Sequence, residues 1–142
     1  MIRLMTGEDY FEVFALWKRI SGMGLRTLDD SQEGIARFLR RNPQTNFVCV
    51  EEKRIVGTIL CGHDGRRGYI YHACVAPEFR GRRLGETLVR TALEALAREK
   101  INKAALVCFG DNELGNAFWR AVGWKKREDL NYLDLSLNGE NT

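Results

Sequence analysis

Three arginines and two glycines fall within six positions, just after an apolar stretch of the chain. The stretch is Tyr71–Glu86, YHACVAPEFRGRRLGE, and an amphipathic segment follows it at once. Proline cannot donate to a sheet ladder, so a strand should end before Pro77. Backbone N–H groups of a glycine-containing turn and a helix start, flanked by arginines, bind phosphate oxygens. The pattern predicts a pyrophosphate-binding turn between a strand and a helix.

Side chains that could move a proton stand on the strand before this turn. Alternation would place Tyr69, Tyr71 and Ala73 on one face, and Ile70, His72 and Cys74 on the other. An imidazole titrates near neutral pH, so His72 is the candidate general base, and Tyr69 is a second catalytic candidate. A half-buried structural histidine is the alternative. Weaker candidates are His63, Asp64, Glu78 and Asp111.

The elements that must position these residues follow from periodicity. Apolar residues at helical spacing predict helices that begin near Tyr10, Ile35, Gly85 and Glu113. Strand-like runs cover 2–4, 47–50, 55–61, 69–75, 104–109 and 131–137. Strands 69–75 and 104–109 flank helix 85–99 as a βαβ unit, so they should be parallel. Ligands collect beyond the carboxyl ends of such strands, which places a site near Val75–Gly85 and Asp111–Asn112.

The last predicted helix has a second face suited to a ligand. Helical spacing places Asn112, Gly115, Asn116 and Trp119 together. A polar amide, a position without a side chain and a flat ring would suit a cofactor lying along the helix. An ordinary, partly exposed helix face is the alternative.

Composition sets broad limits. The 142 residues are most simply one domain, 1–142, with 44% hydrophobic and 29% charged residues. A net charge of +3 suits a small anionic ligand as well as a nucleic acid. The cysteines have no zinc-like spacing, so we expect no metal site and read them as small core residues in a reducing cytoplasm. They are Cys49, Cys61, Cys74 and Cys108. No signal-peptide pattern or membrane-spanning run is present.

Two motifs together resemble the GNAT superfamily of acetyl-CoA-dependent N-acetyltransferases. Arg80-Gly-Arg-Arg-Leu-Gly85 is similar to its acyl-CoA signature, Arg/Gln-x-x-Gly-x-Gly/Ala. Asn112-x-x-Gly115-x-x-Phe118-Trp119-x-x-x-Gly123-Trp124 is similar to its second pattern, Asn-x-x-Ala-x-x-Phe/Leu-Tyr-x-x-x-Gly-Phe. The resemblance covers essentially the whole chain. It implies an α/β (α+β) fold with a mixed, mostly antiparallel sheet, whose parallel central strands splay apart and are flanked by helices.

The resemblance also implies roles for individual residues. Acetyl-CoA would be the acetyl donor, bound in the gap between the splayed strands. The expected cofactor-binding residues are Cys74, Val75, Arg80, Gly81, Arg82, Arg83, Leu84, Gly85, Glu86, Asn112 and Trp119. An N–H near Val75 or Ala76 would polarise the carbonyl that the acceptor amine attacks directly.

Two positions depart from the family pattern. Arg83 stands where the signature has its first glycine, and its N–H is still available for a phosphate. Trp119 stands where the family often has a tyrosine that protonates the departing thiolate. An indole donates a hydrogen bond but is not an acid near neutral pH.

Three classes of function remain open at this stage. The first is transfer of an acetyl group to a primary amine of a small molecule, peptide or protein. The second, motivated by Trp119, is a non-catalytic acyl-CoA sensor. The third is a nucleic-acid module, which lacks a recognition helix or an aromatic and basic stripe. We expect no nucleic-acid or membrane partner, and leave open the acceptor and a homodimer.

Overall fold

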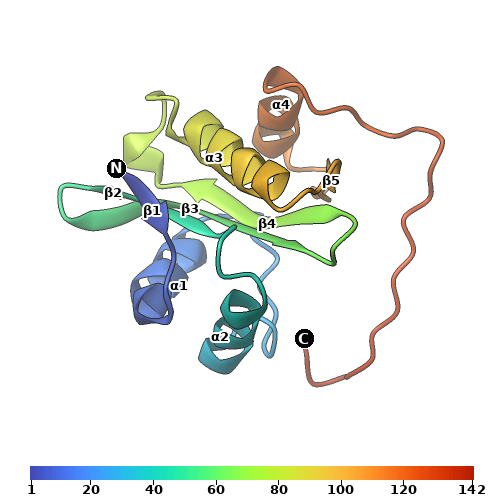
Figure 1. Ribbon diagram of the computed structural model, residues 1–142, viewed down its shortest axis with the longest axis horizontal. Coiled ribbons are helices and arrows are strands. Elements are labelled where there is room, and N and C mark those ends of the chain that lie inside the picture. The colour runs from blue at the N-terminus through green and yellow to red at the C-terminus, as the bar shows by residue number, and fades with distance from the viewer.

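A five-stranded mixed sheet divides the helices into two layers (Figure 1). The computed structural model describes all residues, 1–142. The strands lie side by side in chain order as β1 (Ile2–Leu4), β2 (Phe47–Glu51), β3 (Arg54–His63), β4 (Gly68–Val75) and β5 (Ala104–Ala105). The pairs from β1 to β4 are antiparallel, and β4 pairs with β5 in parallel. The predicted fold class, a mixed and mostly antiparallel sheet with helices on its faces, is confirmed.

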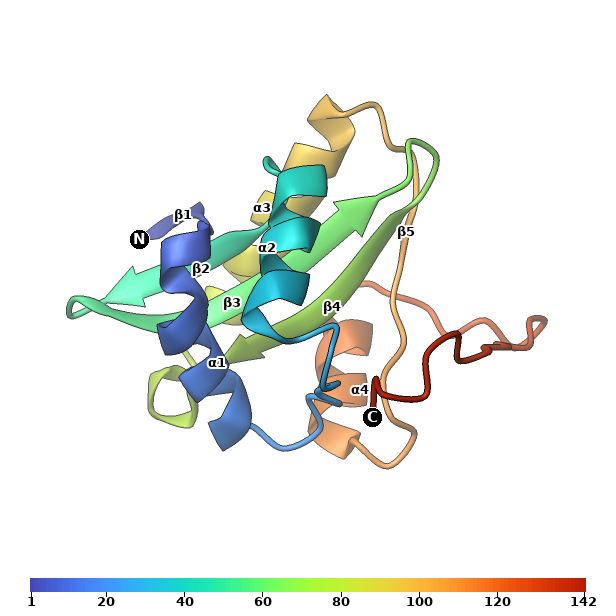
Figure 2. The ribbon, with the colours of Figure 1, turned by 90° about the horizontal axis from the view of Figure 1, so that it is seen from below.

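Two helices cover each side of the sheet. Helices α1 (Tyr10–Arg19) and α2 (Gln32–Arg41) lie on one face, and α3 (Leu84–Arg98) and α4 (Glu113–Ala121) lie on the other (Figures 1 and 2). Short 3₁₀ turns η1 (Gly7–Asp9) and η2 (Pro77–Phe79) precede α1 and α3. No helix combines the length and the apolar character needed to cross a membrane.

The helix starts follow local sequence signals. Thr6 and Asp9 form a capping box at η1, in which Thr6 N donates to Asp9 Oδ2 at 2.8 Å. Ser31 caps α2, because its Oγ accepts from Gly34 N at 3.0 Å.

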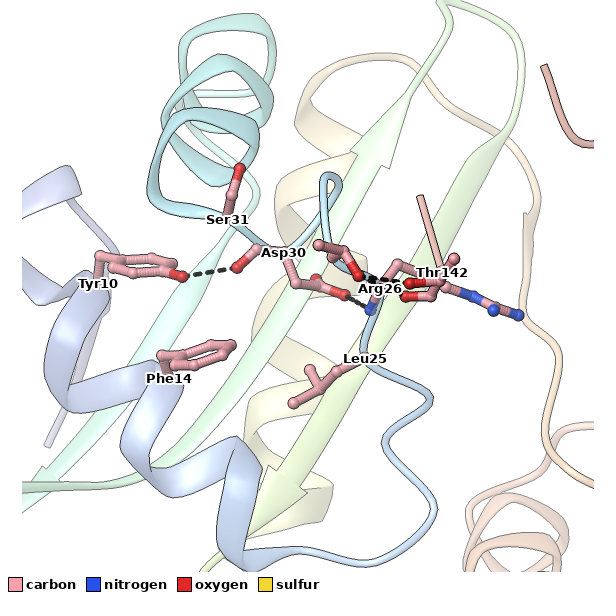
Figure 3. A pocket seen from close by; sticks show the side chains of 8 residues that line it. Tyr10, Phe14, Leu25, Arg26, Asp30, Ser31 and Thr142 are labelled. Carbon is pink, nitrogen blue, oxygen red and sulfur yellow. Dashed lines mark hydrogen bonds between the residues drawn. The ribbon is translucent and has the colours of Figure 1, made fainter. Parts of the chain in front are cut away.

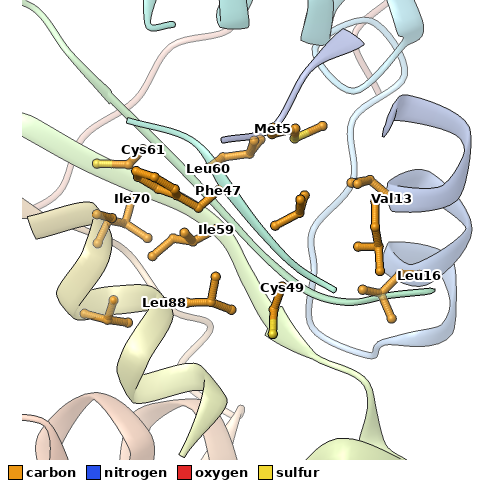
Figure 4. Packing of buried hydrophobic residues seen from close by; sticks show 14 of the residues in the cluster. Met5, Val13, Leu16, Phe47, Cys49, Ile59, Leu60, Cys61, Ile70 and Leu88 are labelled. Atoms are coloured by element: carbon orange, nitrogen blue, oxygen red, sulfur yellow. The ribbon is translucent and has the colours of Figure 1, made fainter. Parts of the chain in front are cut away.

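The core is built around β3, which is buried on both faces of the sheet. Residues 55–62 of this strand are all buried, and their run is nearly continuous in apolar residues, as expected for a central strand. From one side Val13 of α1 is fully buried against it, and from the other Leu88 of α3 is 2% exposed (Figure 4). Trp17 Nε1 donates to Thr58 Oγ1 at 2.9 Å, so the indole is buried without an unpaired donor.

The pairing of β4 with β5 is short. Only Gly68 with Ala104 and Tyr69 with Ala105 are in register. The strand expected over 104–109 is therefore wrong beyond Ala105. A strand requires a neighbour for its backbone hydrogen bonds, and residues 106–109 diverge from β4 to line the opposite wall of a cleft.

The expected strand over 131–137 is also wrong. The backbone of residues 125–137 makes no hydrogen bond, and Leu133, Leu135 and Leu137 are 87%, 84% and 94% exposed. Alternation produces a strand only where a sheet edge accepts the ladder. This segment instead loops away from the sheet, and Asn141 Oδ1 then accepts from Leu28 N at 2.9 Å and Asp29 N at 3.0 Å (Figure 1).

Candidate functional site

A single cleft of about 1370 Å³ opens where β4 and the chain after β5 separate. Its walls come from β4, the start of α3, residues 106–109, α4 and the connection between α1 and α2. The cleft brings together nearly all the site residues named from the sequence: Tyr69, His72, Cys74, Val75, Arg80, Gly81, Arg83, Leu84, Gly85, Glu86, Asn112 and Trp119. Arg82 does not line it.

The turn into α3 presents a row of free backbone donors. None of the backbone N–H groups from Gly81 to Glu86 donates to a protein acceptor, and Thr87 N is the first to bond, to Arg83 O at 3.0 Å. These amides lie at the positive end of a 15-residue helix dipole. Free amides at a helix N-terminus match the oxygens of a pyrophosphate, so the residues present fit coenzyme A.

Two positions in this turn have left-handed backbone conformations. Gly81 has φ 82°, and Arg83 has φ 60° and ψ 20°. A residue with a Cβ atom is disfavoured in this region, which explains why a glycine suits the position of Arg83. The Arg83 side chain is 86% exposed and leaves its own N–H unobstructed. Arg83 therefore adds a positive charge to the turn, and its left-handed backbone conformation is strained.

The other two arginines of the signature have different surroundings. Arg80 Nε donates to Val75 O at 3.1 Å and thereby ties the turn to the end of β4. The Arg82 guanidinium lies 4.9 Å from the centre of the Phe79 ring, a cation–π distance. The Arg82 side chain is therefore directed toward Phe79 and not into the cleft.

A β-bulge changes the faces of β4. Leu60 is opposite Tyr71 and Thr58 is opposite Cys74, so three residue steps on β4 match two on β3. The expectation that Tyr71 and His72 point to opposite faces is therefore wrong. The centre of the Tyr71 ring lies 5.7 Å from that of Phe38 in α2, and the centre of the His72 ring lies 4.7 Å from that of Trp17 in α1. Both helices cover the same face of the sheet (Figure 2).

The end of β4 offers one main-chain donor to the cleft. Ala76 N donates to Val56 O at 2.7 Å, so Ala76 is not available to polarise a carbonyl. The backbone N–H and C=O groups of neighbouring residues in an antiparallel strand point in alternating directions. Those of Val75 therefore point away from β3 and toward the cleft. The bond from Arg80 to Val75 O, on that outer side, agrees with this direction. The same alternation turns the backbone of Cys74 toward β3.

His72 lies in the floor of the cleft with one nitrogen engaged. Its Nε2 is 2.6 Å from Asp30 Oδ1, and the imidazole side chain is 12% exposed. Its main-chain oxygen accepts from Thr58 Oγ1 at 3.1 Å. Nδ1 makes no hydrogen bond with the protein, and no fully buried side-chain N or O atom lacks a partner. Nδ1 is therefore in contact with the space of the cleft.

The sequence suggested that all four cysteines are core residues, and this is wrong for two of them. Cys49 and Cys61 are buried, whereas Cys74 and Cys108 are half-buried and line the cleft. The difference arises because β4 and residues 106–109 form the walls rather than the interior. Burial raises the pKa of the Cys74 thiol above its ordinary value, and Thr58 Oγ1 lies 3.6 Å from its Sγ. A protonated thiol is a poor nucleophile.

Asn112 and Trp119 bring α4 to the cleft. Asn112 caps this helix, since its Oδ1 accepts from Gly115 N at 2.9 Å. Its carboxamide oxygen therefore caps the helix, and its Nδ2 makes no hydrogen bond with the protein. The centre of the Trp119 ring lies 5.0 Å from that of Phe118 and 5.2 Å from that of Trp124, and this packing fixes the orientation of Trp119 beside the cleft.

Sequence reasoning did not find the residues that surround His72. Asp30 lies just before α2, and no local signal links it to a histidine 42 positions later. Tyr71 is 46% exposed, and its ring lies 4.6 Å from that of Tyr69. Burial raises the pKa of Tyr69 to about 12, so its hydroxyl stays protonated. Together these tyrosines and Phe38 form an aromatic wall beside the histidine.

A smaller cavity of about 360 Å³ lies around Asp30 and Tyr10 (Figure 3). Its lining residues are Tyr10, Phe14, Leu25, Arg26, Thr27, Asp30, Ser31 and Thr142. Asp30 lines both this cavity and the large cleft. Nowhere do three His, Cys, Asp or Glu side chains gather as a metal site.

Known proteins share this sequence pattern and this fold. The model of the acetyltransferase (GNAT) family matches residues 10–124. Acetyltransferase SG1711 of Sodalis glossinidius (strain morsitans) is 33% identical over 129 residues, which cover 91% of this chain and 89% of that protein.

Solved structures agree with this relationship at the level of the fold. The PaiA N-acetyltransferase of Thermoplasma acidophilum, in complex with coenzyme A, has a TM-score of 0.75 at 17% identity, over 88% of this chain and 89% of that chain. The aminoglycoside acetyltransferase meta-AAC0020 from an uncultured soil metagenomic sample, in complex with sisomicin, has a TM-score of 0.76 at 16% identity, over 97% of this chain and 96% of that chain. The sequence match over most of the chain and the shared architecture establish that this chain belongs to the GNAT family of acetyltransferases.

Proposed function

We propose that this chain transfers an acetyl group from acetyl-CoA to a primary amine by direct attack, with His72 as the general base. One observation carries the proposal. A single cleft contains both the free amides that begin α3 and a histidine whose Nδ1 has no protein partner. The first feature suits the pyrophosphate of coenzyme A, and the second suits the proton of an attacking amine.

The cofactor half of the cleft follows from the turn. The amides of Gly81 to Glu86 would hold the pyrophosphate, and the exposed guanidiniums of Arg80 and Arg83 would add attraction. The N–H of Val75 would hydrogen-bond the pantetheine arm or the acetyl oxygen. Asn112 and Trp119 would contact the same arm from α4. When bound, acetyl-CoA supplies an acetyl group activated as a thioester.

The acceptor half contains the proton-transfer groups. The amine nitrogen forms a bond to the acetyl carbon while the carbon–sulfur bond breaks, and His72 Nδ1 takes the amine proton. The protonated hydroxyl of Tyr69 can donate a hydrogen bond to the acceptor. Burial keeps the Cys74 thiol protonated, which favours direct attack over an acyl-cysteine route.

The leaving thiolate has no tyrosine acid at position 119. Thiols titrate near 8.5, so the thiolate can depart without one. A missing general acid lowers the rate by about 10²–10⁴-fold and does not block the reaction. The same feature favours a second candidate function, a sensor that binds acyl-CoA without turnover.

The acceptor is a primary amine of a small molecule or of a peptide. The aminoglycoside acetyltransferase meta-AAC0020 shares this fold, and its structure is a complex with sisomicin. An aromatic wall of Phe38, Tyr69 and Tyr71 beside His72 supports an acceptor with an apolar surface next to its amine.

Thiol release from acetyl-CoA tests the proposal. The purified protein is given acetyl-CoA with an alkylamine, an aralkylamine, a polyamine, an aminoglycoside or a lysine peptide in turn. We expect amine-dependent release of free thiol with at least one acceptor. We also expect His72→Gln to lower it by about 10²–10⁴-fold without a change in acetyl-CoA affinity. Binding of acetyl-CoA with no release for any amine would favour the sensor, and full activity of His72→Gln would refute the assigned base.

A further inference from the structure

His72 and Asp30 form a shielded hydrogen-bonded pair beside the cleft. His72 Nε2 lies 2.6 Å from Asp30 Oδ1, and the two side chains are 12% and 6% exposed. Trp17 packs against the imidazole with the ring centres 4.7 Å apart. Little water reaches the pair, so the interaction is screened less than an ion pair on the surface.

Asp30 is held by two other parts of the chain. Arg26 N donates to Asp30 Oδ2 at 2.7 Å, and the Tyr10 hydroxyl donates to the Asp30 main-chain oxygen at 2.7 Å (Figure 3). Both carboxylate oxygens therefore have partners, and the side chain cannot rotate without losing one of them. A fixed carboxylate in turn fixes the imidazole to which it is bonded.

The chemistry of a carboxylate decides which imidazole nitrogen carries the proton. An ionised carboxylate only accepts hydrogen bonds, so Nε2 of a neutral His72 must carry the hydrogen that it donates. The lone pair then lies on Nδ1. Nδ1 has no protein partner and contacts the cleft, which is where a proton acceptor is required.

We propose that Asp30 is the positioning residue of this site, which holds His72 in the Nε2–H tautomer with Nδ1 free to take the amine proton. The proposal rests on the proposed function for its catalytic part. The N–H bond of the amine breaks, its proton joins the Nδ1 lone pair, and the Asp30 carboxylate stabilises the resulting imidazolium without accepting the proton itself.

Imidazole nitrogen NMR measures the tautomer directly, without any need for turnover. The chain has only two histidines, and His63→Gln leaves His72 as the single imidazole signal. We expect that signal to report the Nε2–H tautomer. In Asp30→Asn the carboxamide can donate to Nε2, and we expect the proton to move to Nδ1. Glu33→Gln is the matched control, since the Glu33 carboxylate is 87% exposed, does not line the cleft and does not bond His72.

Kinetics of the same variants separate positioning from a merely structural role. We expect Asp30→Asn to lower kcat/KM for the amine by about 10²–10⁴-fold, with acetyl-CoA affinity unchanged and partial recovery in Asp30→Glu. A structural role would instead lower the melting temperature and leave the tautomer as it was. Glu33→Gln should keep the wild-type kcat.

The outcomes distinguish failure of this inference from failure of the proposed function. An Nδ1–H tautomer in the protein with Asp30 intact overturns the inference, and so does an unchanged tautomer in Asp30→Asn. If Asp30→Asn does not fold, the tautomer of the Asp30-containing protein alone decides. If no amine is acetylated, the proposed function fails, yet the tautomer still shows whether Asp30 orients His72. A changed tautomer with unchanged turnover removes His72 as the base.

Discussion

Tyr71 and His72 are consecutive residues whose rings lie on the same face of the sheet, against α2 and α1 respectively. A strand without irregularity would send them to opposite faces. The bulge between the pairs Leu60–Tyr71 and Thr58–Cys74 removes that alternation. The cleft consequently has an aromatic wall next to its candidate base.

Tyr71→Ala should weaken binding of the acceptor amine. The ring is 46% exposed in a residue that lines the cleft, and an aromatic contact contributes about 0.5–1.5 kcal/mol. We expect KM for the amine to rise about 2–10-fold at unchanged acetyl-CoA affinity, measured by steady-state thiol release. Phe11→Ala is the control, since Phe11 is 69% exposed and is not a lining residue of the cleft. Equal KM values for both variants would count against an acceptor on this wall.

Arg83→Gly should stabilise the protein. Arg83 has φ 60°, a conformation that costs a residue with a Cβ atom about 1–2 kcal/mol and costs glycine little. Part of this gain is offset by the larger entropy of glycine in the unfolded chain, so we expect about 1 kcal/mol in urea unfolding.

Arg82→Gly is the matched control for this change. Arg82 is not among the residues with positive φ, so glycine there should not raise the free energy of unfolding and should lower it by up to about 1 kcal/mol.

Acetyl-CoA affinity should fall by only a few-fold in Arg83→Gly, because the backbone N–H of residue 83 remains. A large loss of affinity would mean that the side chain, not the backbone, holds the cofactor.

Asp9→Ala should destabilise the protein at neutral pH and much less in acid. The hydrogen bond from Arg3 lowers the pKa of the Asp9 carboxyl below its usual value, with Arg3 Nη1 2.9 Å from Oδ2. A carboxyl whose pKa is lower in the folded protein than in the unfolded chain stabilises the folded protein. This contribution is complete above the pKa of the unfolded chain, near 3.9, and is lost as the pH falls through the pKa of the folded protein.

We therefore expect a loss of about 1–3 kcal/mol at pH 7 that shrinks below pH 4, measured by urea unfolding across pH. Glu8→Ala is the control, because Glu8 is exposed and makes no hydrogen bond through its side chain. A loss for Asp9→Ala that stayed constant down to pH 2 would contradict the role of its charge.

Leu135→Ser should leave stability nearly unchanged. Leu135 is 84% exposed, and substitutions at such positions usually alter the free energy of unfolding by less than about 0.5 kcal/mol. Leu88→Ala is the contrasting variant, since Leu88 is 2% exposed and its truncation should cost about 2–5 kcal/mol. A loss above 2 kcal/mol for Leu135→Ser would mean that residues 131–137 pack as the strand that their alternation indicates.

The local signals of the sequence were sufficient for the turn between β4 and α3. Pro77 ends β4 and Gly81 permits a left-handed turn, and the residues from Leu84 begin a helix with free amides. Each of these effects acts over a few residues, so it can be read from the chain before any folding is considered. The order of strands and helices from β1 to α4 was predictable for the same reason.

Tertiary structure decided the surroundings of His72. The bulge in β4 depends on its register with β3, and the partnership of Asp30 with His72 depends on how α2 docks against the sheet. The exposed course of residues 131–137 depends on whether a sheet edge is available. Contacts between residues 42 positions apart have no signature in sequence periodicity, because periodicity reports only which face of an element is apolar and not what meets it.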